Sequence, residues 1–415
     1  MRSFFKSSFW TFITIAMRTV SALIINKLVA LQFGPNGITL LSHFQNLITI
    51  ATTVPNDGIN RGLITYLAGK ETKDGNYGSY FAAGLWWQLV VLTVMIGLFF
   101  TQSNFFLKAF LQDGFTSGWL FFFFAGLFLL LLSNFFQAIL IARQALTWYT
   151  GLVTIWSLGS AGLIWLLLKQ YALSNLLLLY LVTQGIAAVA GGMLIWIKGW
   201  CPRISKRIIS QRAVRDIGKF IIMALTLVVC SNLVNFYVRE LMIRRFDLYQ
   251  TGLWQAAVKI SDNYTMVFTS LIGLVYYPKI ATLITQPKAF RTFVRRIFFS
   301  LVPLVALGLL LFYVLRRWFI LLLFDEGFLP VTYLLDYQVL GDFFKMSAWI
   351  LSYIILAQGR VAFNILIQVI GAVLYLVLLF WCLDTFGLEG VTVAHCASFG
   401  LFFLFNIIYF RKLIF

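Results

Sequence analysis

The sequence predicts an all-α integral membrane protein with about twelve transmembrane helices. Of its 415 residues, 61% are hydrophobic and only 11% are charged, a balance that would leave a soluble domain with too much apolar surface in water. The apolar runs are continuous and have lengths near the roughly 17 to 25 residues that a spanning helix requires. Transmembrane strands would instead alternate polar and apolar residues, so helices remain as the way to satisfy the backbone.

Apolar runs between turn signals and charge clusters place the predicted helices in order. In the first half they cover residues 9–31, 38–57, 80–101, 118–141, 149–168 and 174–197. In the second half they cover residues 216–242, 250–275, 293–315, 333–357, 361–383 and 387–410. The first run is too long for the core of a signal peptide, so we expect it to remain as a helix.

The two halves match at one fixed offset, which predicts an internal repeat. Gly37 and Gly58 recur at the same spacing as Gly252 and Gly273, and the other helices of the first half shift onto those of the second. With six helices in each half, both halves cross the membrane in the same sense. We therefore predict two six-helix bundles at 1–200 and 216–415, joined by a basic linker at 201–215 and related by a parallel pseudo-twofold repeat.

The charge balance is strongly basic, with 32 Lys and Arg against 14 Asp and Glu. Most of these basic residues lie in short connections that a regular up-and-down path places on one side of the membrane. A positive excess of this kind marks the cytoplasmic side. The distribution predicts a cytoplasmic location for both termini and for the linker, and it argues against nucleic acid as a partner.

Polar side chains inside the predicted helices are the best indication of function, because an ionisable group at mid-membrane costs about 2.5–3.5 kcal/mol to insert. On the first helix, Thr14, Arg18 and Ser21 share one face, and Gln45 belongs to a similar stripe on the second. Equivalent stripes occur in the second half, and we predict that all of them line a shared wet cleft. They contain Asn232, Asn235, Arg239, Gln255, Lys259, Asp262, Asp342 and Lys345.

Several of these groups have a structural alternative. Lys259 with Asp262, and Asp342 with Lys345, are three residues apart and would neutralise each other within one helix. Arg239 lies near a predicted helix end, where its side chain would reach the interface.

Three further polar residues allow two interpretations. His43 and His395 would relay protons or simply be hydrogen-bonded packing residues. Asp57 would exchange an ion or cap a helix beside Gly58.

No catalytic or cofactor signature is present. The sequence contains no Walker loop, no HExxH, no GxSxG and no acidic cluster for a divalent metal, which argues against an enzyme and against ATP-driven transport by this chain alone. Its four cysteines lack CxxC spacing and indicate neither a zinc site nor a disulfide framework.

Three stretches resemble one known family. The segment 33–37, Phe-Gly-Pro-Asn-Gly, with Phe44-Gln45-Asn46 after it, is similar to the first loop and second helix of Wzx-type flippases of the MATE-like MOP exporter superfamily. The eighth predicted helix, from Gly252-Leu253-Trp254-Gln255 through Lys259 to Tyr277-Pro278, resembles the same family. Gly387-Leu388-Glu389-Gly390 supplies a third match, and the similarity runs through the whole chain in order.

The resemblance implies that the chain moves undecaprenyl-pyrophosphate-linked oligosaccharides, such as an O-antigen unit or lipid III, from the cytoplasmic to the periplasmic leaflet of a bacterial inner membrane. It implies alternating access, with the lipid bilayer, a polymerase and a chain-length regulator as partners. The basic and amide residues named above would hold the pyrophosphate and sugar. No cofactor is implied apart from a coupling H⁺ or Na⁺. The candidates for exchanging that ion are Asp262, Asp342, Asp57 and His43.

Two rival functions remain open. A MATE-like multidrug or cation antiporter would share the fold, but it should prefer an anionic cavity, and the predicted helices carry four clear basic residues. An integral-membrane polysaccharide polymerase commonly has a large periplasmic loop, and the sequence contains no connection of that length.

Overall fold

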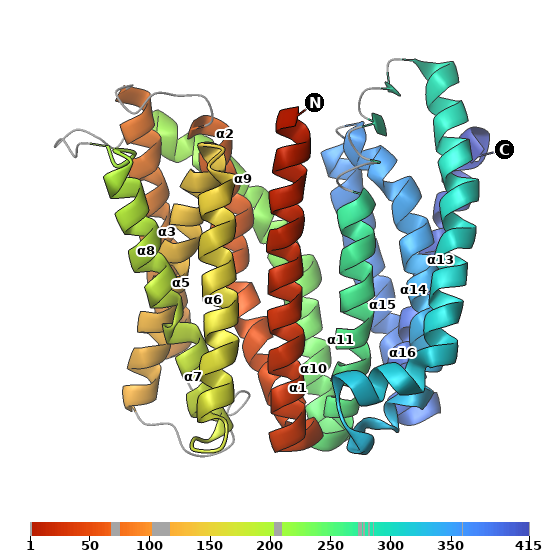
Figure 1. Ribbon diagram of the computed structural model, residues 1–415. Helices are drawn as coiled ribbons and strands as arrows, with labels where there is room; N and C mark the ends of the chain where they lie inside the picture. The colour runs from red at the N-terminus through yellow and green to blue at the C-terminus, as the bar shows by residue number, and fades with distance from the viewer. Residues whose placement is uncertain are drawn as a thin grey trace. The chain divides into compact units, whose positions relative to one another are not determined.

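The computed structural model describes residues 2–67, 75–101, 117–202, 210–272, 276, 279–280, 283–284, 286–358 and 360–414. These residues form α-helices with short π and 3-10 segments, and they contain no β-strand (Figure 1). The prediction of an all-α chain is therefore confirmed. The predicted Gly273 and Tyr277-Pro278 lie outside the described residues.

The chain divides into two compact units. The first contains residues 1–33 and 40–241, and the second contains 34–39 and 242–415. This division differs from the predicted one, because the helices that follow the basic linker pack within the first unit. The repeat and the two six-helix bundles stay predictions.

The first unit is built from helices of very different lengths. It contains α1 (Arg2–Thr53), η1 (Val54–Asn60), α2 (Arg61–Leu67), α3 (Gly75–Thr101), α5 (Ser117–Ala142), α6 (Leu146–Leu167), α7 (Leu173–Val182), α8 (Gln184–Ile197), α9 (Gln211–Leu227), η2 (Val228–Leu233) and most of α10 (Val234–Arg245). Its apolar core includes Leu63, Tyr77, Phe135 and Ile217, which are fully buried.

The second unit follows from the end of α10. It contains α11 (Leu248–Leu271), α13 (Pro287–Leu323), η4 (Glu326–Phe328), α14 (Val331–Ala357), α15 (Val361–Phe386), η5 (Gly387–Glu389) and α16 (Gly390–Ile414). Helices α14 and α16 pack along each other most extensively. Gly341 allows this approach, since a Cβ at this position would lie 3.0 Å from the Cα of Cys396.

The long helix α1 contains the predicted break. Gly34 has φ 60° and ψ −158°, which is not helical, and Pro35 follows it. Glycine tolerates a positive φ, and proline removes a backbone donor, so the two together interrupt the helix. The segment after the break belongs to the second unit, where the Thr39 hydroxyl donates to the Leu248 carbonyl at 2.7 Å.

A π-helical segment in the first unit lies against a neighbouring helix. Pro55 stands at the start of η1, and Gly58 lies inside it. A Cβ on Gly58 would lie 3.0 Å from the Cα of Ile221 on α9, so this glycine permits the close contact of the two helices. Segments of π-helix are uncommon and often accompany functional sites.

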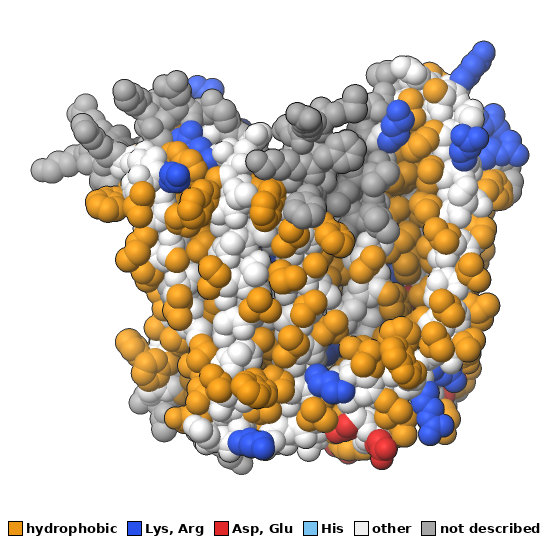
Figure 2. Space-filling view, viewed as in Figure 1, with side chains coloured by type: hydrophobic (Ala, Val, Ile, Leu, Met, Phe, Trp, Pro, Cys, Tyr) orange, Lys and Arg blue, Asp and Glu red, His pale blue; other side chains and the backbone are white. Residues whose placement is uncertain are grey.

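The outer faces of the helices are apolar. Figure 2 shows hydrophobic side chains along the helices, with Lys and Arg concentrated toward their ends. Helices α3, α6 and α13 expose Leu98, Ile155 and Leu310, respectively, each by more than half of its surface. Exposed apolar surface on this scale suits a lipid environment rather than water.

Among the described residues, seven helical stretches are long and apolar enough to cross a membrane. Three of them run through more than one helix, namely Phe12–Leu67, Leu173–Ile197 and Ala362–Ile414. Helices α11 and α14 are not among the seven, and both carry predicted polar stripes, which lower their hydropathy. The predicted count of about twelve crossings stays a prediction.

Candidate functional site

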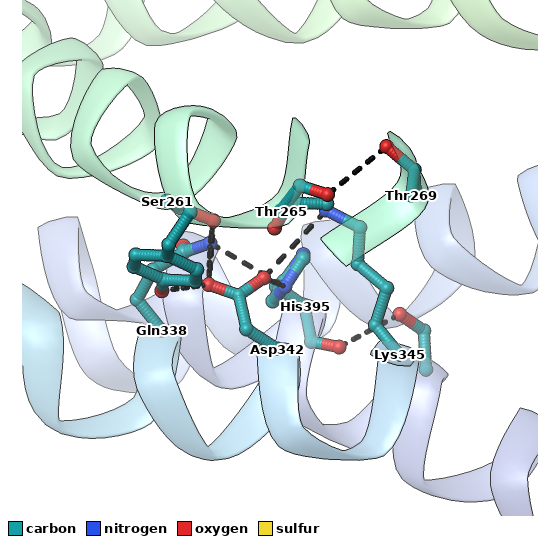
Figure 3. Close-up of polar contacts among 9 residues, drawn as sticks. Ser261, Thr265, Thr269, Gln338, Asp342, Lys345 and His395 are labelled. Atoms are coloured by element: carbon teal, nitrogen blue, oxygen red, sulfur yellow. Dashed lines mark hydrogen bonds and ion pairs between the residues drawn. The ribbon is translucent and has the colours of Figure 1, made fainter. Parts of the chain in front are cut away.

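The second unit contains a buried polar cluster around Asp342, which we call the Asp342 cluster: Ser261, Tyr264, Gln338, Asp342, Lys345 and His395 (Figure 3). The side chain of Asp342 has no exposed surface. Its Oδ2 accepts hydrogen bonds from the Ser261 hydroxyl at 2.5 Å and from the Tyr264 hydroxyl. The Gln338 amide nitrogen lies 3.4 Å from the same oxygen.

Two nitrogen groups face the other oxygen of Asp342. Nε2 of His395 lies 3.1 Å from Oδ1, and Nζ of Lys345 lies 3.6 Å from it. The Lys345 ammonium also lies 5.2 Å from the ring centre of Trp349 and 5.7 Å from that of Phe399. The aromatic rings therefore contribute a cation–π attraction in addition to the ion pair.

Helical spacing accounts for this arrangement. Gln338, Asp342 and Lys345 are four and three residues apart on α14, so they share one face. Ser261 and Tyr264 share one face of α11 in the same way, and His395 comes from α16. A Cβ on Gly341 would lie 2.4 Å from Cδ2 of His395, so this glycine leaves the room that the imidazole occupies.

Asp342 and Lys345 thus form the ion pair within one helix that the sequence analysis gave as a structural alternative. The neighbouring residues of α11 join the same electrostatic environment, since Asp262 interacts with Lys345, Asp342, Lys259 and His395. Gln255, also on α11, is buried. The structure therefore brings Lys259, Asp262, Asp342 and Lys345 into one region of the second unit, whereas the cleft that all the stripes would share stays a prediction.

Arg18 is the corresponding charge in the first unit. It is exposed, and its Nη2 donates to Oε1 of Gln137 on α5 at 3.2 Å. Nε2 of Gln137 donates in turn to the Ser133 hydroxyl at 3.0 Å, which fixes the amide so that its oxygen faces Arg18. No carboxylate of the described residues lies within ion-pair distance of Arg18.

The rest of the predicted α1 stripe has a structural role. The hydroxyls of Thr14 and Thr150 are 2.8 Å apart, and the Ser21 hydroxyl donates to the Ser157 carbonyl at 2.5 Å. Thr14 and Ser21 are buried in these contacts with α6. Thr14 and Ser21 thus attach α1 to α6, and Arg18 is the charged residue of the stripe that stays exposed.

A second polar group of the first unit is buried where α10 meets α1. Arg239 is 8% exposed, and its Nη1 donates to the Ser42 carbonyl at 2.9 Å. The alternative in which Arg239 reaches the membrane interface is therefore wrong. His43 is 1% exposed, lies 4.0 Å from Glu240 and stacks on Phe236 with a 5.0 Å centroid distance.

The remaining predicted site residues are more dispersed. Nδ2 of Asn232 donates to the Thr53 hydroxyl at 2.6 Å, whereas Asn235 is exposed and Gln45 is half-buried. Asp57 lies within η1 and pairs with Arg61 at 2.6 Å, so it does not cap a helix as the alternative had it.

Sequence reasoning missed half of the Asp342 cluster. Ser261, Tyr264 and Gln338 were not singled out, and His395 was weighed mainly as a packing residue. The spacing of Gln338 four residues before Asp342 was a usable signal. Nothing on α16 itself indicated that His395 faces a carboxylate, because that contact joins residues 53 positions apart.

Comparison with known proteins agrees with this architecture. No model of a protein family matches the chain. Lipid III flippases of Escherichia coli K12 and Shigella flexneri are each 25% identical to it over 414 residues, covering 96% of this chain and 96% of the relative.

Two solved structures show the same fold at low sequence identity. An inward-facing multidrug resistance MATE family transporter of the MOP superfamily superposes with a TM-score of 0.81 at 10% identity, covering 97% of this chain and 98% of that one. The lipid II flippase MurJ gives a TM-score of 0.73 at 12% identity, with coverages of 98% and 87%. These proteins are flippases and transporters, not enzymes. The chain is accordingly an integral membrane protein with the fold of these transporters, and it is similar along nearly its whole length to lipid III flippases.

Proposed function

We propose that this chain flips an undecaprenyl-pyrophosphate-linked oligosaccharide, an O-antigen unit or a related saccharide, from the cytoplasmic to the periplasmic leaflet of a bacterial inner membrane. Its 25% identity to lipid III flippases over 414 residues supports the class of substrate. The mechanism is alternating access, coupled to an ion gradient.

The observation that carries this proposal is the environment of Arg18. A guanidinium within a membrane helix needs a partner, a wet cavity or an anionic ligand. Here the amide of Gln137 orients it, the ring centre of Tyr149 lies 6.0 Å from its Cζ, the side chain is exposed, and no carboxylate of the described residues neutralises it. A planar guanidinium binds phosphate oxygens through two parallel hydrogen bonds. Arg18 is therefore suited to hold a pyrophosphate.

The other predicted contacts follow the same logic. Lys345 and Lys259 supply ammonium groups for the head group, and Gln45, Asn232 and Asn235 supply amides for sugar hydroxyls. Arg239 and Gln255 are buried in the structure, so their proposed contacts require a conformation in which α10 and α11 open. Asp262, Asp342, Asp57 and His43 are the candidates for ion exchange.

The test uses a strain that lacks its own flippase for a lipid-linked saccharide. We expect the unmodified chain to restore surface polysaccharide, and purified chain in proteoliposomes to expose a fluorescent pyrophosphate-linked saccharide to an external probe. Arg18→Gln should reduce flipping by about tenfold or more, since it removes a charge-assisted bond of about 1.5–3 kcal/mol. Arg18→Lys should retain part of the activity, because the charge remains but the paired donors do not.

The matched control is Lys169→Gln, which removes an exposed basic residue of the same unit. It should leave flipping unchanged. Full polysaccharide assembly with Arg18→Gln, at equal protein levels, would remove Arg18 from the scheme. Failure of the unmodified chain to flip any pyrophosphate-linked saccharide would reject the proposed function.

A multidrug antiporter is the second candidate, because the MATE transporter shares the fold. Such a pump exports cationic drugs and should present unpaired carboxylates to them. In this chain Asp342 is paired with Lys345, Asp57 is paired with Arg61, and Asp262 interacts with both Lys345 and Lys259. Drug resistance conferred by the chain, without flipping, would favour the antiporter.

A further inference from the structure

Both histidines of the chain lie beside a carboxylate within helices, one in each unit. His43 lies 4.0 Å from Glu240, and His395 lies 3.1 Å from Asp342. The His395 pair is the closer of the two and belongs to the larger network (Figure 3). The proposed function needs an ion, and the geometry of this network bears on which ion binds and where.

The carboxylate of Asp342 is surrounded by donors. Hydroxyl groups of Ser261 and Tyr264 and the amide of Gln338 face Oδ2, while an ammonium and an imidazole nitrogen face Oδ1. A carboxylate that accepts this many bonds is stabilised as the anion. A proton placed on Asp342 would break at least one of these bonds, so Asp342, although one of the four candidates for ion exchange, acts as a fixed counter-ion.

A sodium ion would find poor ligands at the same place. Hard metal cations are held by several oxygen atoms. The side of Asp342 that a cation would approach is occupied by Nζ of Lys345 at 3.6 Å and by Nε2 of His395 at 3.1 Å. A bound metal ion would be repelled by the ammonium and would have nitrogen rather than oxygen neighbours there.

His395 is the member of the cluster that is able to take up a proton. An imidazole ordinarily changes its charge between about pH 5 and 8. While it is neutral, Asp342 and Lys345 balance each other and the three groups carry no net charge. The side chains of His395 and Lys345 are 16% and 13% exposed, whereas Asp342 is closed off. A proton therefore has access to the imidazole without opening the carboxylate.

Charged groups face His395 from two neighbouring helices. Asp342 and Lys345 face it from α14, and Asp262, whose own neighbours include Lys259, interacts with it from α11. On its own helix the ring packs on Phe399 with a centroid distance of 4.8 Å. Among the described residues, α13 and α15 place no charged side chain within ion-pair distance of it.

We propose that His395 is a proton-binding site of this chain, that Asp342 is its counter-ion, and that protonation displaces Lys345 from Asp342. The physical reason for the displacement is that two cations would then compete for Oδ1 of one buried carboxylate. This inference rests on the proposed function for its role in transport, and it names H⁺ rather than Na⁺ as the coupling ion.

Trp349 provides the readout, since its ring lies 5.2 Å from the Lys345 ammonium. The contribution of Trp349 to the tryptophan emission is the difference between the purified full-length chain and its Trp349→Phe variant. This contribution should change in one transition as the pH is lowered. The midpoint should be the same in sodium chloride and in choline chloride of equal concentration. His395→Gln should abolish the transition, and His395→Arg should hold the emission at its low-pH value.

The matched control is His43→Gln, which removes the histidine of the other unit and should keep the Trp349 transition. Persistence of the transition in His395→Gln, its absence from the unmodified chain, or a midpoint that moves with sodium would overturn the proposal. The comparison of sodium chloride with choline chloride uses the unmodified chain, so it tests the proposal even where the variants fold poorly.

Transport is measured separately, which separates the two proposals. If the chain flips the saccharide but shows no transition, only the proposal of a proton site at His395 is rejected. If the chain shows the transition but flips no saccharide, the proposed function is rejected. In proteoliposomes, an imposed pH gradient should accelerate flipping by the unmodified chain and have no effect on His395→Gln.

Discussion

In an Asp342→Asn variant the second unit loses the charge around which α11, α14 and α16 place their donors. The Lys345 ammonium, 13% exposed, would then lack its carboxylate. Unit charges 3.6 Å apart attract each other by about 4.6 kcal/mol at an effective dielectric constant of about 20. Removal of one partner of a buried pair typically destabilises a protein by about 3–5 kcal/mol. We therefore expect the free energy of unfolding to fall by about 3–5 kcal/mol.

The assay is reversible unfolding in bicelles or mixed micelles, followed by helix content. An Asp342→Asn/Lys345→Met double variant removes both charges, so it should be more stable than Asp342→Asn by about 1–3 kcal/mol. The reasoning is refuted if Asp342→Asn falls within about 1 kcal/mol of the unmodified chain. It is also refuted if the double variant is less stable than the single one, since the lone ammonium would then not be the source of the loss.

Two further predictions concern positions outside the Asp342 cluster. Gly252→Ala places a Cβ 2.1 Å from the Pro35 carbonyl oxygen and should destabilise the second unit by roughly 1–3 kcal/mol. Gly308→Ala, where a Cβ would meet nothing within 4 Å, is its control and should be neutral or slightly stabilising in the same unfolding assay. The ion pair of Arg245 with Asp384 is 2.6 Å long, but the aspartate is 70% exposed. Asp384→Asn should therefore change the free energy of unfolding by less than about 1 kcal/mol, and a larger loss would contradict this estimate.

The polar network also bears on how the helices of the second unit hold together. Lipid and apolar side chains are similarly hydrophobic, so helix association in a membrane depends on packing and on hydrogen bonds between helices. Gly341 brings α14 against α16, and Gly390 brings α16 against the end of α15, where a Cβ would lie 2.3 Å from the Cys382 carbonyl oxygen. The Asp342 cluster then joins α11 to the same pair.

The break in α1 illustrates what local residues determine. Gly34 and Pro35 interrupt the helix wherever they stand, because one tolerates a positive φ and the other lacks a backbone donor. The ends of α5, α6 and α14 also lie close to the predicted ranges, since runs of apolar residues and their flanking turns specify them. The i,i+3 spacing placed Asp342 and Lys345 on one face, and the structure joins them.

Other parts of the site depended on contacts between distant residues. Arg18 was predicted to line a cleft, but only the packing of α5 against α1 identifies its contact with Gln137, which is 119 positions away. Arg239 is adjacent to a glutamate in sequence, yet its buried guanidinium donates to the carbonyl of Ser42, on another helix. Thr14 and Ser21, expected in a cleft, hold α1 against α6 instead.

The sequence alone determined that this chain is helical, membrane-embedded and interrupted at identifiable glycines and prolines, because hydropathy and backbone preferences act over a few neighbouring residues. It also determined which helices carry charge. Only the tertiary structure decided which charged side chains form ion pairs and which do not, since this depends on the residues that each helix face contacts. His395 shows the difference, because its role follows from an aspartate on another helix rather than from anything on its own.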